Sequence, residues 1–414
     1  MSKEPAAAAT RRGTSMKFWG FVRENGKVGI RNHVLVVGIT RNVATLAYMI
    51  ASSVRGTRLY VGPNENGRSR DDRETMARVI TGLAKNPNVG GVLLVGNKPD
   101  GGYAEFTYEN IVENIMASGK PVETLFISRD GGHAACIGLG IQKARHLAEL
   151  CSAQRREEVD WGKLCIAVKC GYSDATSGMA GNPVIGYVFD RLCDAGGTAI
   201  FSETTEVIGA EEIVARRFAD AGQRDVFLSC VRKVEEEAKA TGQDIRSINP
   251  IPANIEAGLT TLEEKSLGAI AKAGTKPIMQ CVRYGESPSA PGLNYMDSWM
   301  SSSALFAGFS SAGAVLNIFQ FGGGAMPDKC MMPVADTGVV APILFATGNP
   351  RAYDHGKLEI DFNSGVVISE KASIEETGEK LIRHICDIAS GRMTKVETLN
   401  VREPVELYLQ GPCL

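Results

Sequence analysis

The sequence predicts an α/β protein with mainly parallel sheets in two Rossmann-like domains. The first observation is that short apolar, strand-like runs recur along the 414 residues, with helix-like segments between many of them. This alternation is typical of βαβ units and parallel sheets. The second observation is that several runs are apolar at every position, as expected for strands covered on both faces of a sheet.

Taken in chain order, eight runs predict strands. They are 33–39 (HVLVVGI), 58–63 (RLYVGP), 91–96 (GVLLVG), 121–128 (PVETLFIS), 164–171 (LCIAVKCG), 197–203 (GTAIFSE), 277–282 (PIMQCV) and 314–323 (AVLNIFQFGG). A helix is predicted at 73–86, where apolar residues recur at helical spacing behind an acidic start, and another at 140–159. A further helix is expected to begin at Pro183, since proline suits the first turn.

Polar segments between these elements predict the domain organisation. Residues 1–16 are expected to be a disordered leader and 17–155 an N-terminal α/β domain. Residues 156–400 form the predicted C-terminal α/β domain, which carries most of the polar motifs, and 401–414 form a tail or an arm for a partner. Within the predicted C-terminal domain, a further domain boundary is expected near residues 240–262, a stretch that is rich in Gly, Pro and Asn.

The composition excludes several classes of protein. A formal net charge of −2 gives no electrostatic footprint for nucleic acid or an anionic membrane. No apolar run approaches the roughly 18 residues of a membrane span, and no signal-peptide core is present. The ten cysteines are scattered without a C-x-x-C pair, so most are expected to be reduced and buried. We therefore expect a cytoplasmic protein that binds neither nucleic acid nor membrane.

The stretch VKCGYSDATSGMAGNPVIG, residues 168–186, gathers polar side chains where a predicted strand ends. Ligands of parallel α/β sheets bind outside the carboxyl ends of the strands. Lys169 offers a cation for a substrate carboxylate, and Cys170 offers a thiolate for a metal. Ser173 and Asp174 add a hydroxyl and a carboxylate. The alternative is a plain strand–turn–helix joint with Asp174 as its cap.

Two carboxylates, Glu203 and Glu206, follow the next predicted strand. Such a pair suits a divalent cation or paired acid–base work. The alternative is a capping box, with Ser202 or Thr204 as the N-cap and a glutamate two or three residues later. The residues alone leave both interpretations open.

Amide and basic side chains supply further candidates for substrate binding. Asn182 precedes Pro183 at the start of a helix, whose unpaired N–H groups attract anions. Helix capping accounts for the Thr and Glu residues within 260–264. It does not account for Asn254 or Lys265, which are candidates to face a ligand.

The few histidines limit the choice of acid–base group. Arg31 and His33 lie just before a buried strand, where they are either solvent-facing or in contact with an anion or metal. His133 and Cys136 are three residues apart, which is compatible with a metal but also with simple packing. The glycine-rich FQFGGGAMPDK segment, 319–329, lacks the ending of a P-loop, and no G-x-G-x-x-G fingerprint opens an early helix.

Four motifs in order resemble the altronate and galactarate dehydratase family from about residue 18 to residue 370. They are GKVGIRNHVLV, KCGYSDATSGMAGNPVIG, SETTEVIGAEE and NIEAGLTTLEEKSLGAIAKAG. The resemblance implies a metal-dependent lyase that eliminates water from a small hydroxy carboxylate such as a sugar acid. It also implies a divalent metal, with Fe²⁺ favoured. The large subunit of sulfolactate sulfo-lyase shares the motifs and expels sulfite, which is the alternative function.

Residue type and motif position then give the roles. The predicted catalytic residues are His33, Lys169, Ser173 and Asp174. The predicted substrate-binding residues are Arg31, Lys98, Asn182 and Asn254. The predicted metal ligands are Cys170, Glu203 and Glu206.

Two departures from the family pattern accompany the match. Sugar-acid dehydratases carry Gly-Cys-Glu where this chain has Gly96-Asn97-Lys98, and Lys98 is a candidate to replace lost positive charge. They carry Thr-Gly-Arg-Gly-Thr-Pro where this chain has 321–327, FGGGAMP. A non-catalytic regulatory or scaffold paralogue is therefore a second class of function, and an NAD-linked oxidoreductase is a third that the missing fingerprint disfavours.

The resemblance also predicts partners. Fused family members carry a small N-terminal domain ahead of the region that matches here. We therefore expect a separate small subunit of that type, together with a homo-oligomer of this chain.

Overall fold

The structure is a computed structural model that describes residues 16–104, 106–323, 338–399 and 405–411. Almost all of the predicted leader, and the part of the glycine-rich segment beyond Gly323, lie outside these residues. No helix in the described ranges is long and apolar enough to cross a membrane.

A four-stranded parallel sheet forms the N-terminal half, with the strand order β4-β3-β5-β6. Its strands are β3 (His33–Gly38), β4 (Thr57–Val61), β5 (Val89–Gly96) and β6 (Val122–Phe126). Its helices are α1 (Ala44–Ser53), α2 (Arg70–Lys85), α3 (Tyr108–Met116) and α4 (Gly132–Ala153). Val34 and Val36 pack with α1 and α4, whereas Leu35 and Val37 pack with α2 and α3. The uniformly apolar strand sequences follow from this two-sided cover.

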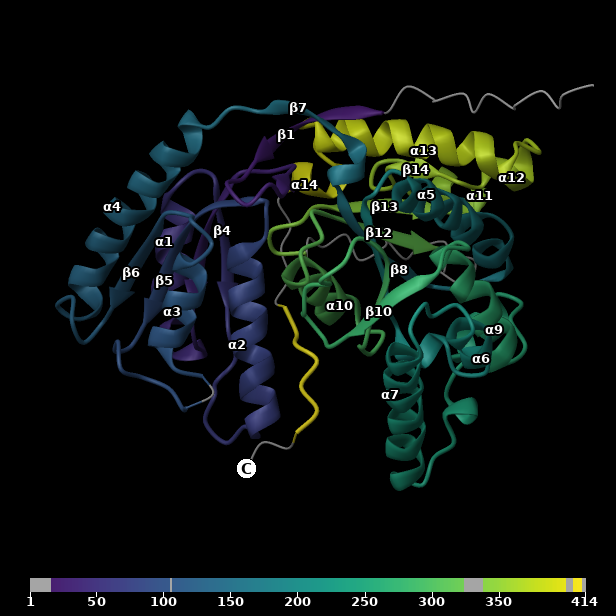
Figure 1. Ribbon diagram of the computed structural model, residues 1–414, viewed down its shortest axis with the longest axis horizontal. Coiled ribbons are helices and arrows are strands. Elements are labelled where there is room, and N and C mark those ends of the chain that lie inside the picture. Colours follow the sequence, from purple (N-terminus) through teal and green to yellow (C-terminus); the bar gives the residue numbers. More distant parts are fainter. Residues whose placement is uncertain (1–15, 105, 324–337, 400–404, 412–414) are drawn as a thin grey trace, which may run out of the picture.

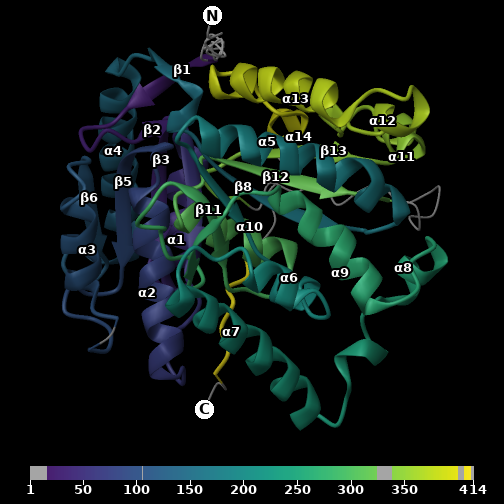
Figure 2. The ribbon, with the colours of Figure 1, turned by 45° about the vertical axis from the view of Figure 1, so that its right-hand side comes forward.

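A seven-stranded parallel sheet forms the C-terminal half, with the order β10-β11-β9-β8-β12-β13-β14. Its strands are β8 (Cys165–Gly171), β9 (Thr198–Phe201), β10 (Ile278–Val282), β11 (Gly292–Met296), β12 (Leu316–Phe321), β13 (Ile343–Thr347) and β14 (Phe362–Asn363). Its longer helices are α5 (Asn182–Asp194), α7 (Ala221–Ala240), α9 (Leu262–Ile270), α10 (Ser302–Ser311) and α13 (Ile374–Ala389). Its short helices include α6 (Glu211–Ala215), α8 (Pro252–Glu256), α11 (Pro350–His355), α12 (Val366–Ser369) and α14 (Lys395–Leu399). Helices α5 and α13 lie together over one face of the sheet (Figure 2).

The predicted α/β class with parallel sheets in two domains is confirmed, with local corrections. The long helix expected at 140–159 begins earlier and ends at Ala153, and Glu157–Asp160 is strand β7 instead. β7 pairs antiparallel with β1 (Lys17–Val22), which also pairs with β2 (Val28–Gly29). The stretch 240–262 is not a domain boundary, because β9 before it and β11 after it are neighbours in one sheet.

The two parallel sheets meet at the amino ends of their strands. Asn88, just before β5, donates its side-chain amide to the carbonyls of Val315 and Val340, which precede β12 and β13. Asn86 makes similar bonds to Ser310 and Ala314. The carboxyl ends of both sheets therefore point away from the junction (Figure 1).

The described part of the C-terminal tail packs on the body of the molecule. It runs between α2 and α10 (Figure 1), and the Tyr408 ring contacts Tyr284 and Trp299. The backbone N–H of Gln410 donates to Asp72 on α2. Residues 405–411 thus contact their own chain rather than extending as an arm.

Candidate active site

The turn after β8 is held in a strained conformation at the carboxyl end of the central strand. Tyr172 has a φ of 45°, in the left-handed region that non-glycine residues rarely adopt. Ser173 and Asp174 follow and are buried. Asp174 Oδ1 accepts from the backbone N–H groups of Thr176 and Ser177, and so caps the helix that follows.

The other oxygen of Asp174 is also engaged, since Asn349 donates its amide to Oδ2 at 3.0 Å. Asp174 therefore ties the β8 turn to the loop after β13. The capping alternative weighed for this residue describes its contacts, and the catalytic role remains a prediction.

Glu203, directly after β9, is the centre of a buried ionic cluster. It is fully buried and has a φ of 80°, in the left-handed region that non-glycine residues rarely adopt. Its Oε2 accepts from the Cys170 backbone N–H at 3.0 Å and from the ammonium group of Lys272. Lys169 Nζ lies 3.5 Å from Oε1. The capping box weighed for this segment is not formed, because no side chain caps the turn Thr204–Glu206.

Lys272 is almost completely buried in the short turn Ala271–Ala273 that follows α9. Burial disfavours its charged form, but the Glu203 carboxylate outweighs burial and the pKa of Lys272 is raised above its usual value. Lys272 therefore keeps its charge at neutral pH.

A second buried pair joins Glu206 to α9. Lys265 Nζ lies 2.9 Å from Glu206 Oε1 and donates to Asn249 Oδ1 at 2.6 Å. Both charged side chains are nearly fully buried. Helix capping did not account for Lys265 in the sequence, and the structure pairs this lysine with a buried glutamate.

Cys170 lies between these pairs and the start of α5. Its Sγ is 3.5 Å from both the hydroxyl of Ser173 and the amide nitrogen of Asn182. Burial raises the pKa of the thiol, Glu203 and Glu206 add to this, and Lys272 opposes it. The thiol is thus neutral in the environment that the described residues provide.

The two amide side chains of the predicted substrate site brace this region. Asn182 donates to the carbonyl of Gly268 on α9 at 2.8 Å, and Asn254 donates to the carbonyl of Ser173 at 3.0 Å. A helical turn, Ser177–Gly181, runs into α5 without a break. The unpaired N–H groups at the start of this helical segment therefore lie near Asp174 rather than at Asn182.

Two of the buried lysines share one carboxylate, and several acceptor oxygens lack a donor. Glu203 lies beside both Lys169 and Lys272, whereas Glu206 pairs with Lys265. Three buried acceptor oxygens have no hydrogen-bond partner among the described residues: Asn182 Oδ1, Glu203 Oε1 and Glu206 Oε2. Unpaired charges and polar atoms are costly to bury, so the arrangement fits a ligand with an anionic group and hydroxyl donors.

The described donors do not fit the iron ion that the resemblance implied. Both predicted carboxylate ligands already pair with buried lysines, and no group of three His, Cys, Asp or Glu side chains in the described ranges is arranged around a common metal position. At an effective dielectric constant of about 20, a divalent cation roughly 5 Å from an ammonium group is repelled by about 7 kcal/mol. We derive no step through a metal.

Three predicted site residues lie elsewhere. All five N–H groups of Arg31 are used, two on the Glu397 carboxylate and three on backbone carbonyls. His33 begins β3 at the amino edge of the sheet, where its backbone N–H donates to the backbone carbonyl of Asn88. Asn88 contacts the residue before β12, and Lys169 and Cys170 lie opposite Phe319 and Gln320 near the other end of that strand, so His33 is separated from the cluster by roughly 15 Å at about 3.3 Å per residue.

Lys98 follows β5 at the carboxyl end of the other sheet. Its side chain is 59% exposed and its nearest carboxylate is Asp100, at 4.0 Å. The structure therefore brings together the predicted residues from 169 to 254 and leaves out Arg31, His33 and Lys98. Sequence reasoning missed Lys272, although the residue stands in the quoted motif as a lone lysine among small residues, A-K-A-G.

Comparison with known proteins identifies the family. Residues 161–410 match the family described as D-galactarate/altronate dehydratase, C-terminal, and residues 20–152 match the one described as D-galactarate dehydratase/altronate hydrolase, second domain. The chain belongs to the D-galactarate/altronate dehydratase family. The resemblance drawn from the four motifs is confirmed.

Relatives with known names include carbon–oxygen and carbon–sulfur lyases. The beta subunit of (2R)-sulfolactate sulfo-lyase from Chromohalobacter salexigens is 33% identical, over 93% of this chain and 96% of that protein. Altronate dehydratase from Bacillus subtilis is 27% identical, over 93% of this chain and 76% of its own length. Galactarate dehydratase (L-threo-forming) from Escherichia coli is 31% identical, over 76% of this chain and 59% of its own length.

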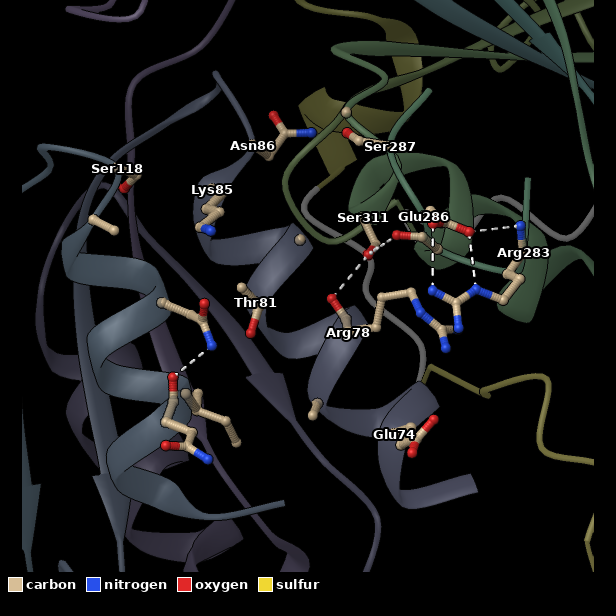
Figure 3. A pocket seen from close by; sticks show the side chains of 18 of the residues that line it. Glu74, Arg78, Thr81, Lys85, Asn86, Ser118, Arg283, Glu286, Ser287 and Ser311 are labelled. Atoms are coloured by element: carbon tan, nitrogen blue, oxygen red, sulfur yellow. Dashed lines mark hydrogen bonds and ion pairs between the residues drawn. The ribbon is translucent and has the colours of Figure 1, made fainter. Parts of the chain in front are cut away.

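A cavity of about 680 Å³ lies apart from the lysine–glutamate cluster. It is bounded by α2, α3 and the loop around Arg283, and its lining includes Arg78, Lys85 and Glu286 (Figure 3). Arg283 pairs with Glu286 at 3.0 Å on its rim. None of the predicted site residues lines it, so the cavity does not belong to the cluster at the strand ends.

Proposed function

We propose that this chain is the large catalytic subunit of a lyase that performs β-elimination on a small 2-hydroxy carboxylate. The first candidate for the leaving group is water, as in a sugar-acid dehydratase. The reaction is assigned to the ends of β8 and β9, where Lys169, Glu203 and Glu206 meet. The family of the chain supports the reaction class, and the geometry supports the place.

The observation that supports this proposal is a buried cluster in which two lysines share one carboxylate and acceptor oxygens lack hydrogen-bond donors. A substrate carboxylate would give Lys169 an anionic partner of its own, and hydroxyl groups would supply hydrogen-bond donors for the oxygens of Asn182 and Glu203. A small hydroxy acid carries both kinds of group on adjacent carbons. An apolar ligand or a cation would satisfy neither.

The residues present can perform the chemistry. Ammonium groups at the substrate carboxylate stabilise the negative charge that develops when the α-proton leaves, and their burial strengthens the effect. Glu206 Oε2, which has no partner within the described structure, is the proposed proton acceptor. The electrons of the broken C–H bond form the C2–C3 double bond, and the group on C3 departs with its bonding pair. The resulting enol becomes a 2-oxo acid.

A departing hydroxyl also needs a proton. The neutral Cys170 thiol and its neighbour Ser173 are the proposed donors, since they adjoin the same cluster. Sulfite is a better leaving group and would not need this help.

Sulfolactate is the second candidate substrate. The relative named for it matches 96% of its length, whereas the altronate dehydratase from Bacillus subtilis is matched over 76%. The sulfolactate sulfo-lyase relative is named as a beta subunit, which also supports a separate small partner for this chain. A scaffold role is the remaining alternative, and it requires that no substrate is turned over.

Steady-state kinetics test the proposal. The full chain is incubated with (2R)-sulfolactate, altronate and galactarate, each with and without the proposed small subunit. We expect a 2-oxo acid from at least one substrate, with sulfite released in equal amount if sulfolactate reacts. Absence of product from all three in the presence of the small subunit would contradict the lyase and favour the scaffold.

A further inference from the structure

We propose that Lys169, Lys265 and Lys272 form an anion site that holds the substrate carboxylate directly, without a bridging metal ion. The identity of the anion rests on the proposed function. The geometry of the lysine site is independent of that function.

The lysines are built into the fold rather than placed on its surface. Lys169 comes from β8, while Lys265 and Lys272 come from α9 and the turn after it, and all three side chains are almost completely buried. A buried ammonium group keeps its charge only beside compensating groups. Glu206 pairs with Lys265, but Lys169 and Lys272 share the single carboxylate of Glu203.

Lys169 is the lysine with the weakest compensation. Its ammonium group donates to the carbonyl of Cys170 at 2.7 Å and lies 5.0 Å from the centre of the Phe319 ring. Its distance to Glu203 Oε1 is 3.5 Å, whereas Lys272 bonds directly to the other oxygen of the same carboxylate. The geometry therefore leaves Lys169 as the cation that a substrate anion would reach.

The acceptors around the lysines have no donors of their own. Glu203 Oε1 and Asn182 Oδ1 are buried and lack a hydrogen-bond partner in the described part of the chain. A 2-hydroxy acid brings its hydroxyl group next to its carboxylate, so one ligand can satisfy the cation and an acceptor together. A divalent ion at the same acceptors would face the lysine charges instead.

Cys170 then has a role other than metal ligation. Its sulfur accepts from the Asn182 amide at 3.5 Å and lies 3.5 Å from the Ser173 hydroxyl, so both of its described neighbours are substrate-site side chains.

The test measures binding of lactate to the full chain by calorimetry after exhaustive dialysis against a chelator. Lactate carries the 2-hydroxy acid group but no leaving group on C3, so turnover cannot complicate the result. Lactamide, which has the same shape without the charge, is the matched control ligand. We expect metal-free protein to bind lactate and not lactamide, and added Fe²⁺ or Mn²⁺ to leave the lactate affinity within twofold.

Two variants locate the site. Lys169→Met should weaken lactate binding at least tenfold, and it leaves the Lys272–Glu203 pair in place so that the fold is preserved. Lys98→Met removes an exposed lysine and should bind lactate as the wild type does. Circular dichroism checks that both variants are folded.

Three results would overturn the proposal: no lactate binding by the metal-free protein, binding that requires added metal, or equal binding by wild type and Lys169→Met. The proposed function fails separately. If lactate binds as expected but none of the three substrates reacts with the small subunit present, the anion site stands and the lyase does not.

Discussion

Lys272 and Glu203 are the pair on which the cluster depends at the scale of single residues. A buried ion pair adds little net stability, but removing one partner leaves an uncompensated charge that costs about 3–5 kcal/mol. The raised pKa of Lys272 means that the stabilising contact is fully present below about 10.5, the usual lysine value, and is lost as the pH rises through the higher folded-state pKa. The contribution is therefore constant across physiological pH.

Lys272→Met tests this pair. We expect the variant to lose about 3 kcal/mol of unfolding free energy, because the buried Glu203 keeps only its longer contact with Lys169. The double variant Lys272→Met/Glu203→Gln should recover part of the loss. Urea denaturation of both, with Lys98→Met as the surface control, gives the values. Equal stability of Lys272→Met and Lys98→Met would show that the pair does not exist in solution.

The sequence predicted many of the residues at this scale because strand ends were recognisable. Lys169, Cys170 and Glu203 each follow an apolar run, and parallel strands bring such ends together. Lys272 could not be predicted in the same way, since it reaches the site from a turn after a helix. Its partner lies 69 positions away in the sequence, so only tertiary structure joins them.

At the scale of elements, the contact between α2 and α10 holds the two halves together. A Cβ atom on Gly82 would lie 2.2 Å from Ser311 Oγ and 2.5 Å from the Ser311 carbonyl oxygen. The helices can approach this closely only because residue 82 lacks a side chain. In α4, by contrast, a Cβ on Gly138 would meet nothing within 4 Å.

These two glycines give a matched pair of alanine substitutions. Gly138→Ala should stabilise the protein by up to about 1 kcal/mol, through higher helix propensity alone. Gly82→Ala gains the same propensity but must push α2 from α10, so we expect a net loss of about 1–3 kcal/mol. Thermal unfolding measures both. A gain in both variants would mean that the close approach at Gly82 is absent.

Helices and strands could be predicted where the apolar pattern of the sequence was clear. The prediction was wrong where pairing with a distant strand determines the local structure. Each of the eight predicted strands is present, since continuous apolar runs of that length suit two-sided burial. Residues 157–159 fall at the end of the helix predicted for 140–159, and that prediction was wrong there. Glu157–Asp160 is a strand because Lys17–Val22, far away in the sequence, offers it a partner.

At the scale of the whole molecule, the amino ends of the two sheets form the junction, and Arg31 fastens it. The guanidinium group makes a bidentate contact with Glu397 at 2.9 and 2.7 Å and also bonds the carbonyls of Ile388 and Arg392. The substrate contact predicted for Arg31 from residue type and motif position stays a prediction. Arg31 lies before β3, whereas ligands of parallel sheets approach the opposite end of the strands.

Arg31→Lys separates the two interpretations. A lysine cannot reproduce the bidentate contact, so we expect a loss of about 2–4 kcal/mol in unfolding free energy. The KM for the substrate should stay within twofold of the wild type in protein that remains folded. A raised KM with unchanged stability would instead support the substrate-binding role. The homo-oligomer stays a prediction at this scale, which sedimentation of the purified chain can test.

The central claim is that the lysine–glutamate cluster at the ends of β8 and β9 is the active site. It is tested most directly by comparing kcat/KM of Lys169→Met and Lys98→Met on the substrate that the wild type turns over, with the small subunit present. We predict that Lys169→Met loses at least about 30-fold, equivalent to about 2 kcal/mol for a buried charge contact, whereas Lys98→Met stays within twofold. Full activity of Lys169→Met, or a loss confined to Lys98→Met, would contradict the account.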